Sequence, residues 1–402
     1  MHLVCYNAAC NGWMRRTVRA QRTIEVLDAL VGFDTTSRNS NLVLVEWVEA
    51  WLDRWGVTHE RVPDKTGNKA NVWATIGPAG VPGIILSGHT DVVPVDGQSW
   101  SSDPFRLTER NGRLYGRGAT DMKGFDACCL AAVPDMVAAP LARPIHLALS
   151  YDEEVGCVGV RGMIARLERE KVKPAACFVG EPTEMGVVIG HKGKRSFRVS
   201  VHGKTCHSSL APQGVNAVEY AARLIVKIRE IGERLARAGA RDPLYDVPYT
   251  TTHTGVVRGG TALNIVPDTC TFEFEFRPLA ADEVTSLAEE VMAHARERLE
   301  PQMRAVDPAA RITFAEMSEF PGLETPAASD VVGLAKRLAG NDGLGKVAYG
   351  TEAGLFARAG IPTVVIGPGS IEQAHKADES IAVAQLEACG TFLDRLIADS
   401  RG

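Results

Sequence analysis

Four short apolar runs, each followed by polar residues, constrain the fold of this chain more than any other feature. The runs are Ile84 to Leu86, Ile145 to Ser150, Cys177 to Val179 and Thr363 to Ile366, and the sequences after them read "SGHTD", "YDEE", "GEPTE" and "GPGS". Runs of this length predict core strands. Helical patterns alternate with them, beginning with "TIEVLDALVGF" at Thr23. The alternation predicts an α/β fold with a mainly parallel sheet flanked by helices.

The pattern changes between Gly193 and Pro321. "KRSFRVSVHG", "YTTTHTGVVRGG", "TCTFEFEFRPL" and "RITFAEM" predict strands, and "NAVEYAARLIVKIREIGERLARA" predicts a helix, as does the segment from about Asp282 to Leu299. Apolar residues recur at helical spacing in the first helix, at Ala217, Ala221, Leu224, Ile228, Ile231 and Leu235. The order β-α-β-β-α-β is that of a compact α+β unit. We therefore expect an N-terminal extension (residues 1–20), an α/β domain in two parts (residues 21–192 and 321–402) and an inserted domain (residues 193–320).

Composition excludes several classes of function. The 402 residues carry a net charge of -5, and no cluster of lysine and arginine is interleaved with aromatic residues, so we expect no nucleic-acid partner. Apolar stretches are too short to cross a membrane. The N-terminus lacks the pattern of a secretory signal, and the nine cysteines have no regular spacing. We expect a cytoplasmic protein with reduced cysteines.

The polar strand ends hold residues that suit metal binding. They are His89 and Asp91 in "SGHTD", Asp121 in the glycine-rich "GRGATDMKG", Glu153 and Glu154 in "YDEE", Glu181 in "GEPTE" and His375 in "EQAHKADE". Parallel strands keep their chemistry at their carboxyl ends, and two histidines with three carboxylates match the ligands of a pair of zinc ions. Adjacent glutamates face opposite ways, so one can bind metal while the other moves protons. Taken singly, each residue is ordinarily a cap or a solvated charge.

Two neighbouring features add to this prediction. Asp91 lies on the same side of an extended backbone as His89, where a carboxylate can fix the tautomer of a metal-bound imidazole. The segment "MKGFDACCLAAV" after Asp121 predicts a helix, which Pro134 should end or kink.

Six motifs together resemble a known superfamily. "SGHTDVVP", "GRGATDMKG", "DEEVG", "GEPT", "GKTCHSS" and "GTEAGLF", in that order, resemble the dizinc aminoacylase/carboxypeptidase superfamily and, within it, the acetylornithine deacetylases. The resemblance runs from about Thr23 to the C-terminus. It implies a hydrolase with two zinc ions, or cobalt in their place, that removes the acetyl group from N2-acetyl-L-ornithine. The substrate would be a small N-acylated amino acid, and the protein a homodimer.

The resemblance also implies a role for each candidate residue. His89 and Glu181 would bind one zinc ion, Glu154 and His375 the other, and Asp121 would bridge them through a loop whose Asp121–Met122 peptide bond is cis. Asp91 would orient His89, and Glu153 would be the general base. The inserted domain would be a dimerisation lid, and its His207 would stabilise the oxyanion in the active site of the neighbouring subunit.

Four further residues are candidates for substrate binding. Arg277 can clamp an α-carboxylate through two parallel hydrogen bonds, although a structural salt bridge explains it equally well. Glu352 can pair with a cationic side chain such as that of ornithine. Asn264 and Thr351 lie near these two residues in the sequence.

Three other interpretations remain open. A desuccinylase of diaminopimelate synthesis would carry "GTSDGRF" where this chain has "GTEAGLF" at Gly350 to Phe356, and a broader deacylase or dipeptidase of the same superfamily is also possible. Cys206 and His207 suggest a cysteine hydrolase, but adjacent residues on a strand point apart. A zinc-binding protein without activity would have lost the base, and Glu153 is present.

Overall fold

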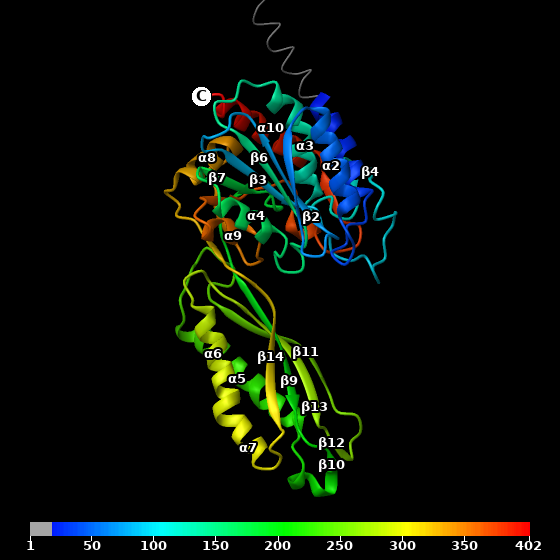
Figure 1. Cartoon of the computed structure of the whole chain (residues 1–402), viewed down its shortest axis with the longest axis vertical. Coiled ribbons are helices and arrows are strands. Elements are labelled where there is room, and N and C mark those ends of the chain that lie inside the picture. The colour runs from blue at the N-terminus through cyan, green and yellow to red at the C-terminus, as the bar shows by residue number, and fades with distance from the viewer. Residues whose placement is uncertain (1–17) are drawn as a thin grey trace, which may run out of the picture. The chain divides into compact units, whose positions relative to one another are not determined.

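The computed structural model of the chain describes residues 18–402 (Figure 1). These residues divide into two compact units. Unit 1 comprises the residues up to Gly190 together with Glu324–Gly345 and Thr351–Gly402, and unit 2 comprises His191–Leu323 and Lys346–Gly350.

A mixed sheet forms the centre of unit 1, and its strand order is β1-β2-β6-β3-β7-β17-β8-β15, with β16 beside β8. The four strands predicted from the apolar runs lie next to one another in its middle: β6 (Ile145–Ser150), β3 (Ile84–His89), β7 (Ala176–Val179) and β17 (Thr363–Val365). All three pairings among them are parallel. The predicted fold class, an α/β unit with a mainly parallel sheet, is therefore confirmed.

Antiparallel strands extend this parallel centre. They include β1 (Thr58–Pro63), β2 (Ala70–Ile76) and β8 (Val187–His191), and the short β15 (Leu323–Glu324) and β16 (Leu344–Val347) complete the sheet. A separate small sheet joins β4 (Thr108–Arg110), β5 (Arg113–Tyr115) and β18 (Ser380–Ala382). The apolar pattern does not predict strands such as β1, which is "THERVP" and largely exposed, because they lack a sustained apolar run.

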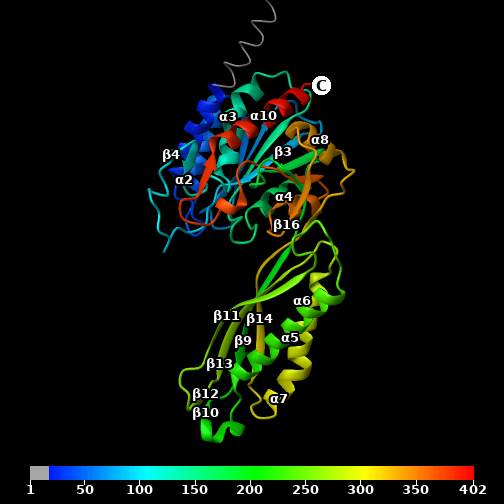
Figure 2. The ribbon, with the colours of Figure 1, turned by 180° about the vertical axis from the view of Figure 1, so that it is seen from behind.

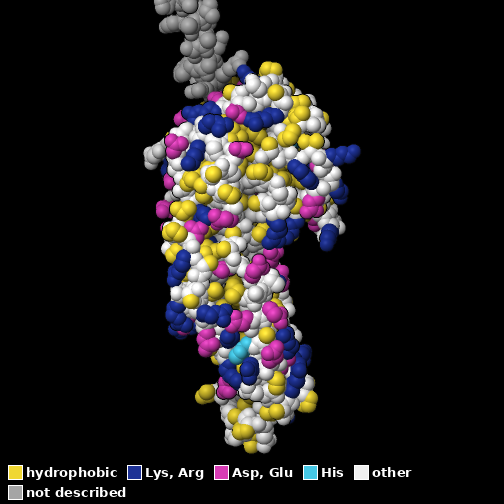
Figure 3. Space-filling view, turned by 90° about the vertical axis from the view of Figure 1, so that its left-hand side faces the viewer, with side chains coloured by type: hydrophobic (Ala, Val, Ile, Leu, Met, Phe, Trp, Pro, Cys, Tyr) yellow, Lys and Arg dark blue, Asp and Glu magenta, His cyan; other side chains and the backbone are white. Residues whose placement is uncertain are grey.

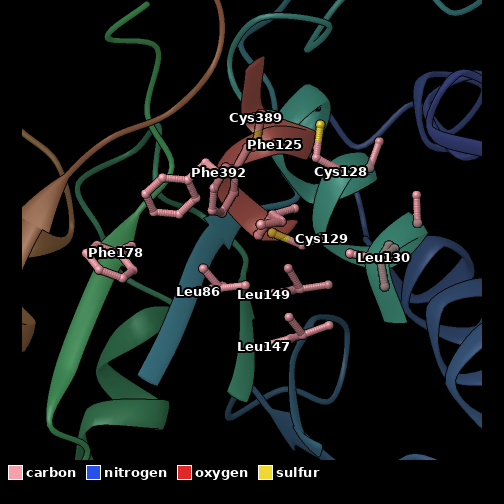
Figure 4. Packing of buried hydrophobic residues seen from close by; sticks show 14 of the residues in the cluster. Leu86, Phe125, Cys128, Cys129, Leu130, Leu147, Leu149, Phe178, Cys389 and Phe392 are labelled. Carbon is pink, nitrogen blue, oxygen red and sulfur yellow. The ribbon is translucent and has the colours of Figure 1, made fainter. Parts of the chain in front are cut away.

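Helices cover both faces of the central sheet. A first helix (residues 18–31), α2 (Leu42–Arg54), α3 (Lys123–Val137), α8 (Asp330–Ala339) and α10 (Val383–Asp399) share one apolar cluster with alternate strand residues. Figure 4 shows part of this cluster, in which the rings of Phe178 on β7 and Phe392 on α10 meet edge to face with centroids 5.3 Å apart. The helices α4 (Val160–Glu168) and α9 (Ala353–Arg358) pack on the opposite side of the strands.

The expectation that Pro134 ends its helix is wrong, whereas the alternative, a kink at Pro134, stays a prediction. The helix α3 continues through Pro134 to Val137. A proline cannot donate to the carbonyl four residues earlier, here that of Leu130. The indole N–H of Trp51 on α2 donates to that carbonyl at 3.0 Å instead. A neighbouring helix thus supplies the hydrogen bond that the proline removes.

The expected N-terminal extension lies mostly outside the described residues. Residues 1–17 are not described, whereas residues 18–20 belong to the first helix rather than to an extension. Arg19 explains this difference. Its guanidinium lies 2.9 Å from a carboxylate oxygen of Asp135 and 2.5 Å from one of Asp394, which ties the start of the helix to α3 and α10.

Unit 2 contains a four-stranded antiparallel sheet with two long helical segments (Figure 2). The sheet order is β11 (Thr251–Gly259), β13 (Thr269–Arg277), β9 (Lys194–His202) and β14 (Arg311–Phe320). The helix α5 (Ala217–Ala238) buries the six apolar residues that the periodicity selects. The side chain of its N-cap, Asn216, accepts hydrogen bonds from two backbone N–H groups of the first turn.

Two details of unit 2 differ from the expectation. The second helical segment passes the predicted end at Leu299: α6 (Val284–His294) leads through a π turn (Ala295–Leu299) into α7 (Glu300–Arg304). A two-stranded antiparallel sheet of β10 (Cys206–His207) and β12 (Ile265–Val266), with a short 3-10 helix (Ser208–Gln213) after β10, was not predicted.

Residues 346–350 fall in unit 2 and not in the second part of the α/β domain. The ammonium of Lys346 lies 2.5 Å from a carboxylate oxygen of Asp242 and over the ring of Tyr245. Gly350 packs against Phe320, where a Cβ atom would meet the ring at 2.0 Å. These contacts join the segment to unit 2.

The surface agrees with the composition. In Figure 3, lysine and arginine side chains are interspersed with aspartate and glutamate over the visible face. Within residues 18–402, no helix is long and apolar enough to cross a membrane. The seven cysteines in this part of the chain are all free, and six of them are buried.

Candidate metal centre

The carboxyl ends of the four central strands of unit 1 bring the predicted ligands together. His89 is the last residue of β3, Glu154 follows β6, Glu181 follows β7, and His375 follows a short 3-10 helix (Ile371–Gln373) after β17. Asp121 lies in the loop that precedes α3, and its peptide bond to Met122 is cis, as the resemblance implies. Because these strands are adjacent and parallel, residues more than 280 positions apart in the sequence meet at one edge.

Asp121 lies between the two histidines. Its Oδ1 is 3.1 Å from His89 Nε2, and its Oδ2 is 3.1 Å from His375 Nε2. On the His89 side, Glu181 Oε1 lies 3.8 Å from the same Nε2 atom. On the His375 side, Glu154 Oε2 lies 3.0 Å away. The five residues thus form two groups that share the carboxylate of Asp121.

The main chain of Asp91, rather than its carboxylate, orients His89. His89 Nδ1 lies 2.9 Å from the carbonyl oxygen of Asp91, whereas the nearest carboxylate oxygen of Asp91 is 3.6 Å away, too far for a good hydrogen bond. A carbonyl can only accept, so Nδ1 carries the proton. In the neutral ring Nε2, which faces Asp121 and Glu181, therefore has a free lone pair.

The carboxylate of Asp91 instead holds the turn that carries the two glutamates. Its Oδ1 accepts from the backbone N–H of Glu153 at 3.0 Å, and its Oδ2 accepts from that of Glu154 at 3.3 Å. The hydroxyl of Ser37 donates to Oδ2 at 2.7 Å. The sequence-based expectation that the carboxylate of Asp91 orients His89 is not met, because the backbone carbonyl of Asp91 takes this place and the carboxylate positions Glu153 and Glu154.

Crowding of acidic groups shifts their pKa values. Burial, with the charges of neighbouring carboxylates, raises the pKa of Glu153 to about 8 and that of Glu154 to about 7. Hydrogen bonds to Asp121 and Glu154 raise the pKa of His375 to about 10. Burial opposes ionisation of His89, yet Asp121, Glu181 and Asp91 raise its pKa well above the ordinary value. The cluster has more negative groups than its two histidines can neutralise.

A pair of divalent cations fits this donor set. Imidazole nitrogen and carboxylate oxygen are the ligands that zinc takes in hydrolases. Donor atoms of His89, Asp121 and Glu154 all lie within 4.8 Å of one another, and so do those of His89, Glu153 and Glu181. The lone pair that Nε2 of His89 offers in the neutral ring and the excess of carboxylates are what a cation site requires, since a bound cation takes the place of the proton.

Sequence reasoning missed the residues that hold this cluster in place. Glu379 is 1% exposed, and its Oε1 accepts from the backbone N–H groups of Thr120 at 2.9 Å and Asp121 at 3.1 Å. Arg117, fully buried, donates to Glu379 Oε2 at 2.7 Å and to the side chain of Gln98 at 2.5 Å. Gln98 in turn donates to the carbonyl of the ligand His375 at 2.9 Å. Arg117 lies in "GRGATD" with Asp121, and Glu379 lies in "HKADE" with His375. Their closeness to the ligands in the sequence could have identified them as supporting residues.

The side chains of Glu352 and Thr351, predicted to bind substrate, are buried inside unit 1. Glu352 is 1% exposed, and the hydroxyls of Ser87 and Ser150 donate to its two oxygens at 2.6 and 2.8 Å. Thr351 is fully buried, and its hydroxyl oxygen accepts from the backbone N–H of Ala353 at the start of α9. The prediction that Glu352 meets a cationic substrate group is therefore wrong, since both its oxygens are used inside unit 1.

In unit 2, Arg277 is a paired residue and Asn264 an exposed one. Arg277 Nε donates to Glu275 Oε1 at 2.9 Å, which is the structural salt bridge held as the alternative explanation. Asn264 directly precedes β12, and its carbonyl accepts from the backbone N–H of Ser208 at 3.0 Å.

His207 is exposed on β10 and has a defined tautomer. Its Nδ1 accepts from the backbone N–H of Ser209 at 3.2 Å and lies 2.8 Å from the hydroxyl of that residue. The neutral ring therefore carries its proton on Nε2. The thiol of Cys206 points to the carbonyl of Leu210 at 3.4 Å and not to His207, which removes the basis for a cysteine hydrolase.

Comparisons with known proteins agree on one family. Residues 85–399 match the model of peptidase family M20/M25/M40. The chain is 33% identical over 385 residues to an acetylornithine deacetylase of Proteus mirabilis, covering 94% of this chain and 95% of the relative. It is also 33% identical over 382 residues to an acetylornithine deacetylase of Pasteurella multocida, covering 93% and 97%.

Solved structures share the fold. An M20 family metallo-carboxypeptidase from Sulfolobus solfataricus superposes with a TM-score of 0.75 at 20% identity, covering 94% of this chain and 99% of that one. A dinuclear metal-binding M20 peptidase from Bacillus subtilis superposes with a TM-score of 0.65 at 14% identity, covering 95% and 98%.

Proposed function

Because this chain belongs to peptidase family M20/M25/M40 and is a metal-dependent hydrolase that acts on amide bonds, we propose that it removes the acetyl group from N2-acetyl-L-ornithine. The products would be ornithine and acetate. One observation carries this proposal: relatives named for this activity match the chain over nearly its whole length. Since ornithine is a precursor of arginine, the proposed role is in arginine biosynthesis, in the cytoplasm.

We propose two zinc ions, with cobalt as a substitute, at the carboxyl edge of the central sheet. His89 and Glu181 would hold one ion, Glu154 and His375 the other, and Asp121 would bridge them. Support comes from the two oxygens of Asp121, each 3.1 Å from a different histidine. When bound, such ions lower the pKa of water and polarise the amide carbonyl.

Glu153 is the proposed general base. Its backbone N–H is held by Asp91, and its carboxylate lies within 4.8 Å of donor atoms of His89 and Glu181. Glu153 takes a proton from the water that attacks the amide carbon. It then returns that proton to the amine nitrogen as the C–N bond breaks, so one carboxylate serves both halves of the reaction.

The proposed dimer brings in His207. Its Nε2–H is free to donate to an oxyanion, because Nδ1 is occupied by Ser209. We propose that it does so in the active site of a second copy of the chain. Exposed apolar side chains of unit 2 support a surface suited to a partner. Leu210, Leu263 and Ile265, in or next to the β10–β12 sheet in the sequence, are 48%, 101% and 42% exposed, and Val257 on β11 is 54% exposed. Asn264, beside them, remains the candidate contact for substrate in this unit.

The test is a panel of N-acyl amino acids offered to zinc-loaded protein. We expect acetate release from N-acetylornithine with the highest kcat/KM, and loss of activity on chelation of the metal. N-succinyl-diaminopimelate and N-acetylmethionine are the comparison substrates. A clear preference for the succinylated compound would replace the proposed substrate by that of a desuccinylase, and full activity after metal removal would overturn the mechanism.

A further inference from the structure

The turn after the general base carries a buried thiol that touches it. Cys157 is 1% exposed, and its Sγ lies 3.2 Å from Glu153 Oε1 with the thiol as donor. Burial and the nearby carboxylates raise the pKa of this thiol well above its usual value, so it keeps the proton it donates. Neither the metal ligands nor the dimer proposal uses this residue.

Backbone hydrogen bonds fix the two side chains next to each other. The N–H of Cys157 donates to the carbonyl of Glu153 at 2.8 Å, closing a turn in which residues i and i+4 are neighbours. Gly156 and Cys157 have positive φ angles of 118° and 53°, which the turn requires. The contact of the thiol with the carboxylate is therefore part of a defined loop geometry.

A clamp from a neighbouring strand holds this turn at both ends. The side chain of Asn71 on β2 accepts from the backbone N–H of Tyr151 at 3.3 Å and donates to the carbonyl of Gly159 at 2.9 Å. Asp91 fixes the N–H of Glu153 from another side. With the backbone held in this way, the remaining freedom of Glu153 lies in its side-chain torsions.

We propose that Cys157 is a positioning residue, whose thiol holds one oxygen of Glu153 and leaves the other oxygen to exchange protons with water and the leaving amine. This inference rests on the proposed role of Glu153 as base. A general base must lie within hydrogen-bond reach of the proton it takes, and a misplacement of about 1 Å can cost about a hundredfold in rate. A weak thiol donor suits the task, because it restrains the carboxylate without neutralising it.

The test compares two substitutions at this position in the full-length, zinc-loaded protein. Cys157→Ala removes the donor, and we expect kcat for N-acetylornithine to fall about tenfold. KM and bound zinc should stay unchanged, since only the positioning of the Glu153 carboxylate in the transition state is lost. Cys157→Ser keeps a donor, and kcat should return to within about threefold of wild type. Cys389→Ala, which removes a buried thiol in the core on α10, is the control for packing and should retain wild-type kcat.

Each outcome decides the inference. If Cys157→Ala keeps wild-type kcat, or if Cys157→Ser is as slow as Cys157→Ala, the thiol does not act as a hydrogen-bond donor to the base. Crystal structures of wild type and Cys157→Ala add a measure that needs no activity. The Glu153 carboxylate should leave its place in the variant, and an unchanged position would overturn the inference. Absence of metal-dependent hydrolysis in wild type would count against the proposed function alone.

Discussion

Charged residues are arranged in opposite ways in the two units. On the sheet of unit 2, three acids are paired with bases: Arg195 lies 2.8 Å from Glu316, Arg198 lies 2.8 Å from Glu273, and Arg277 lies 2.9 Å from Glu275. At the carboxyl edge of unit 1, five carboxylates face two histidines, counting Asp91 and Glu153 with the three proposed ligands.

The difference shows how to separate structural charges from functional ones. Balanced pairs on an exposed sheet contribute little energy and need no partner from outside. An acidic cluster with too few bases is stable only if protons or cations neutralise it. The raised pKa values of Glu153, Glu154 and His375 show that these groups bind protons more tightly than usual. The same distinction explains why Arg277 looked functional in the sequence and is paired in the structure.

The largest expected effect comes from removing one acid at the unbalanced edge. Asp121→Ala should lose bound zinc and reduce kcat/KM by roughly a thousandfold or more, because both proposed ions lose a ligand. Glu153→Ala should lose a similar share of kcat while keeping both ions, because it removes the base alone. Zinc content by mass spectrometry and acetate release distinguish the two variants.

A balanced acid in unit 2 is the matched control. Glu273→Ala removes a carboxylate of the same kind, paired with Arg198, and should change neither zinc content nor kcat. The comparison between the units would fail if this variant were as impaired as Asp121→Ala, or if Glu153→Ala kept normal turnover.

Much of this arrangement is predictable from the sequence because it depends on local patterns. Apolar runs locate the four central strands, and parallel strands bring their carboxyl ends to one edge, so the residue pattern predicts that His89 and Glu181 lie at the same edge. Their assignment to one ion came from the resemblance and not from the pattern. The partners of Glu352 could not be predicted, because Ser87 and Ser150 lie 265 and 202 residues away in the sequence. For the same reason the sequence pattern does not show that Trp51 replaces the hydrogen bond lost at Pro134.

A histidine of unit 1 that has no carboxylate partner should behave in the opposite way to His375. His146 stacks on Trp73, lies near Arg166, and has its pKa lowered to about 4 by burial. Below the unfolded pKa of about 6.5, the unfolded chain binds a proton that the folded chain excludes, so stability falls as the pH drops toward 4. At pH 5 the loss from this residue should be about 2 kcal/mol relative to pH 7.

Urea unfolding at pH 7 and pH 5 measures this effect. His146→Gln should reduce the loss of stability between the two pH values, whatever its effect on stability at pH 7. His253→Gln, which changes an exposed histidine of unit 2, should leave the loss unchanged. If wild type and His146→Gln had the same pH dependence of stability, the lowered pKa of His146 would not be the cause of the loss.

The smallest expected effect, a partial return of activity, concerns His207, the one residue of unit 2 that is proposed to take part in catalysis. In the proposed dimer, the base Glu153 acts in its own subunit and His207 acts in the partner's active site. Homodimers of Glu153→Ala and of His207→Ala should both be nearly inactive. In a mixed dimer, the site that keeps Glu153 receives an intact His207, and the other site lacks both.

Random pairing makes about half of the dimers mixed, so roughly a quarter of wild-type activity should return under two-fold symmetry. Co-expression with two affinity tags isolates the mixed species, in which about half of wild-type activity is expected. The two variants must first be shown to bind zinc and to associate normally, because a dimer that fails to form would also be inactive. If the mixed dimer stays as inactive as its parents, His207 acts within its own subunit. If the His207→Ala homodimer itself keeps wild-type activity, His207 has no part in the reaction and the catalytic chemistry belongs to unit 1 alone.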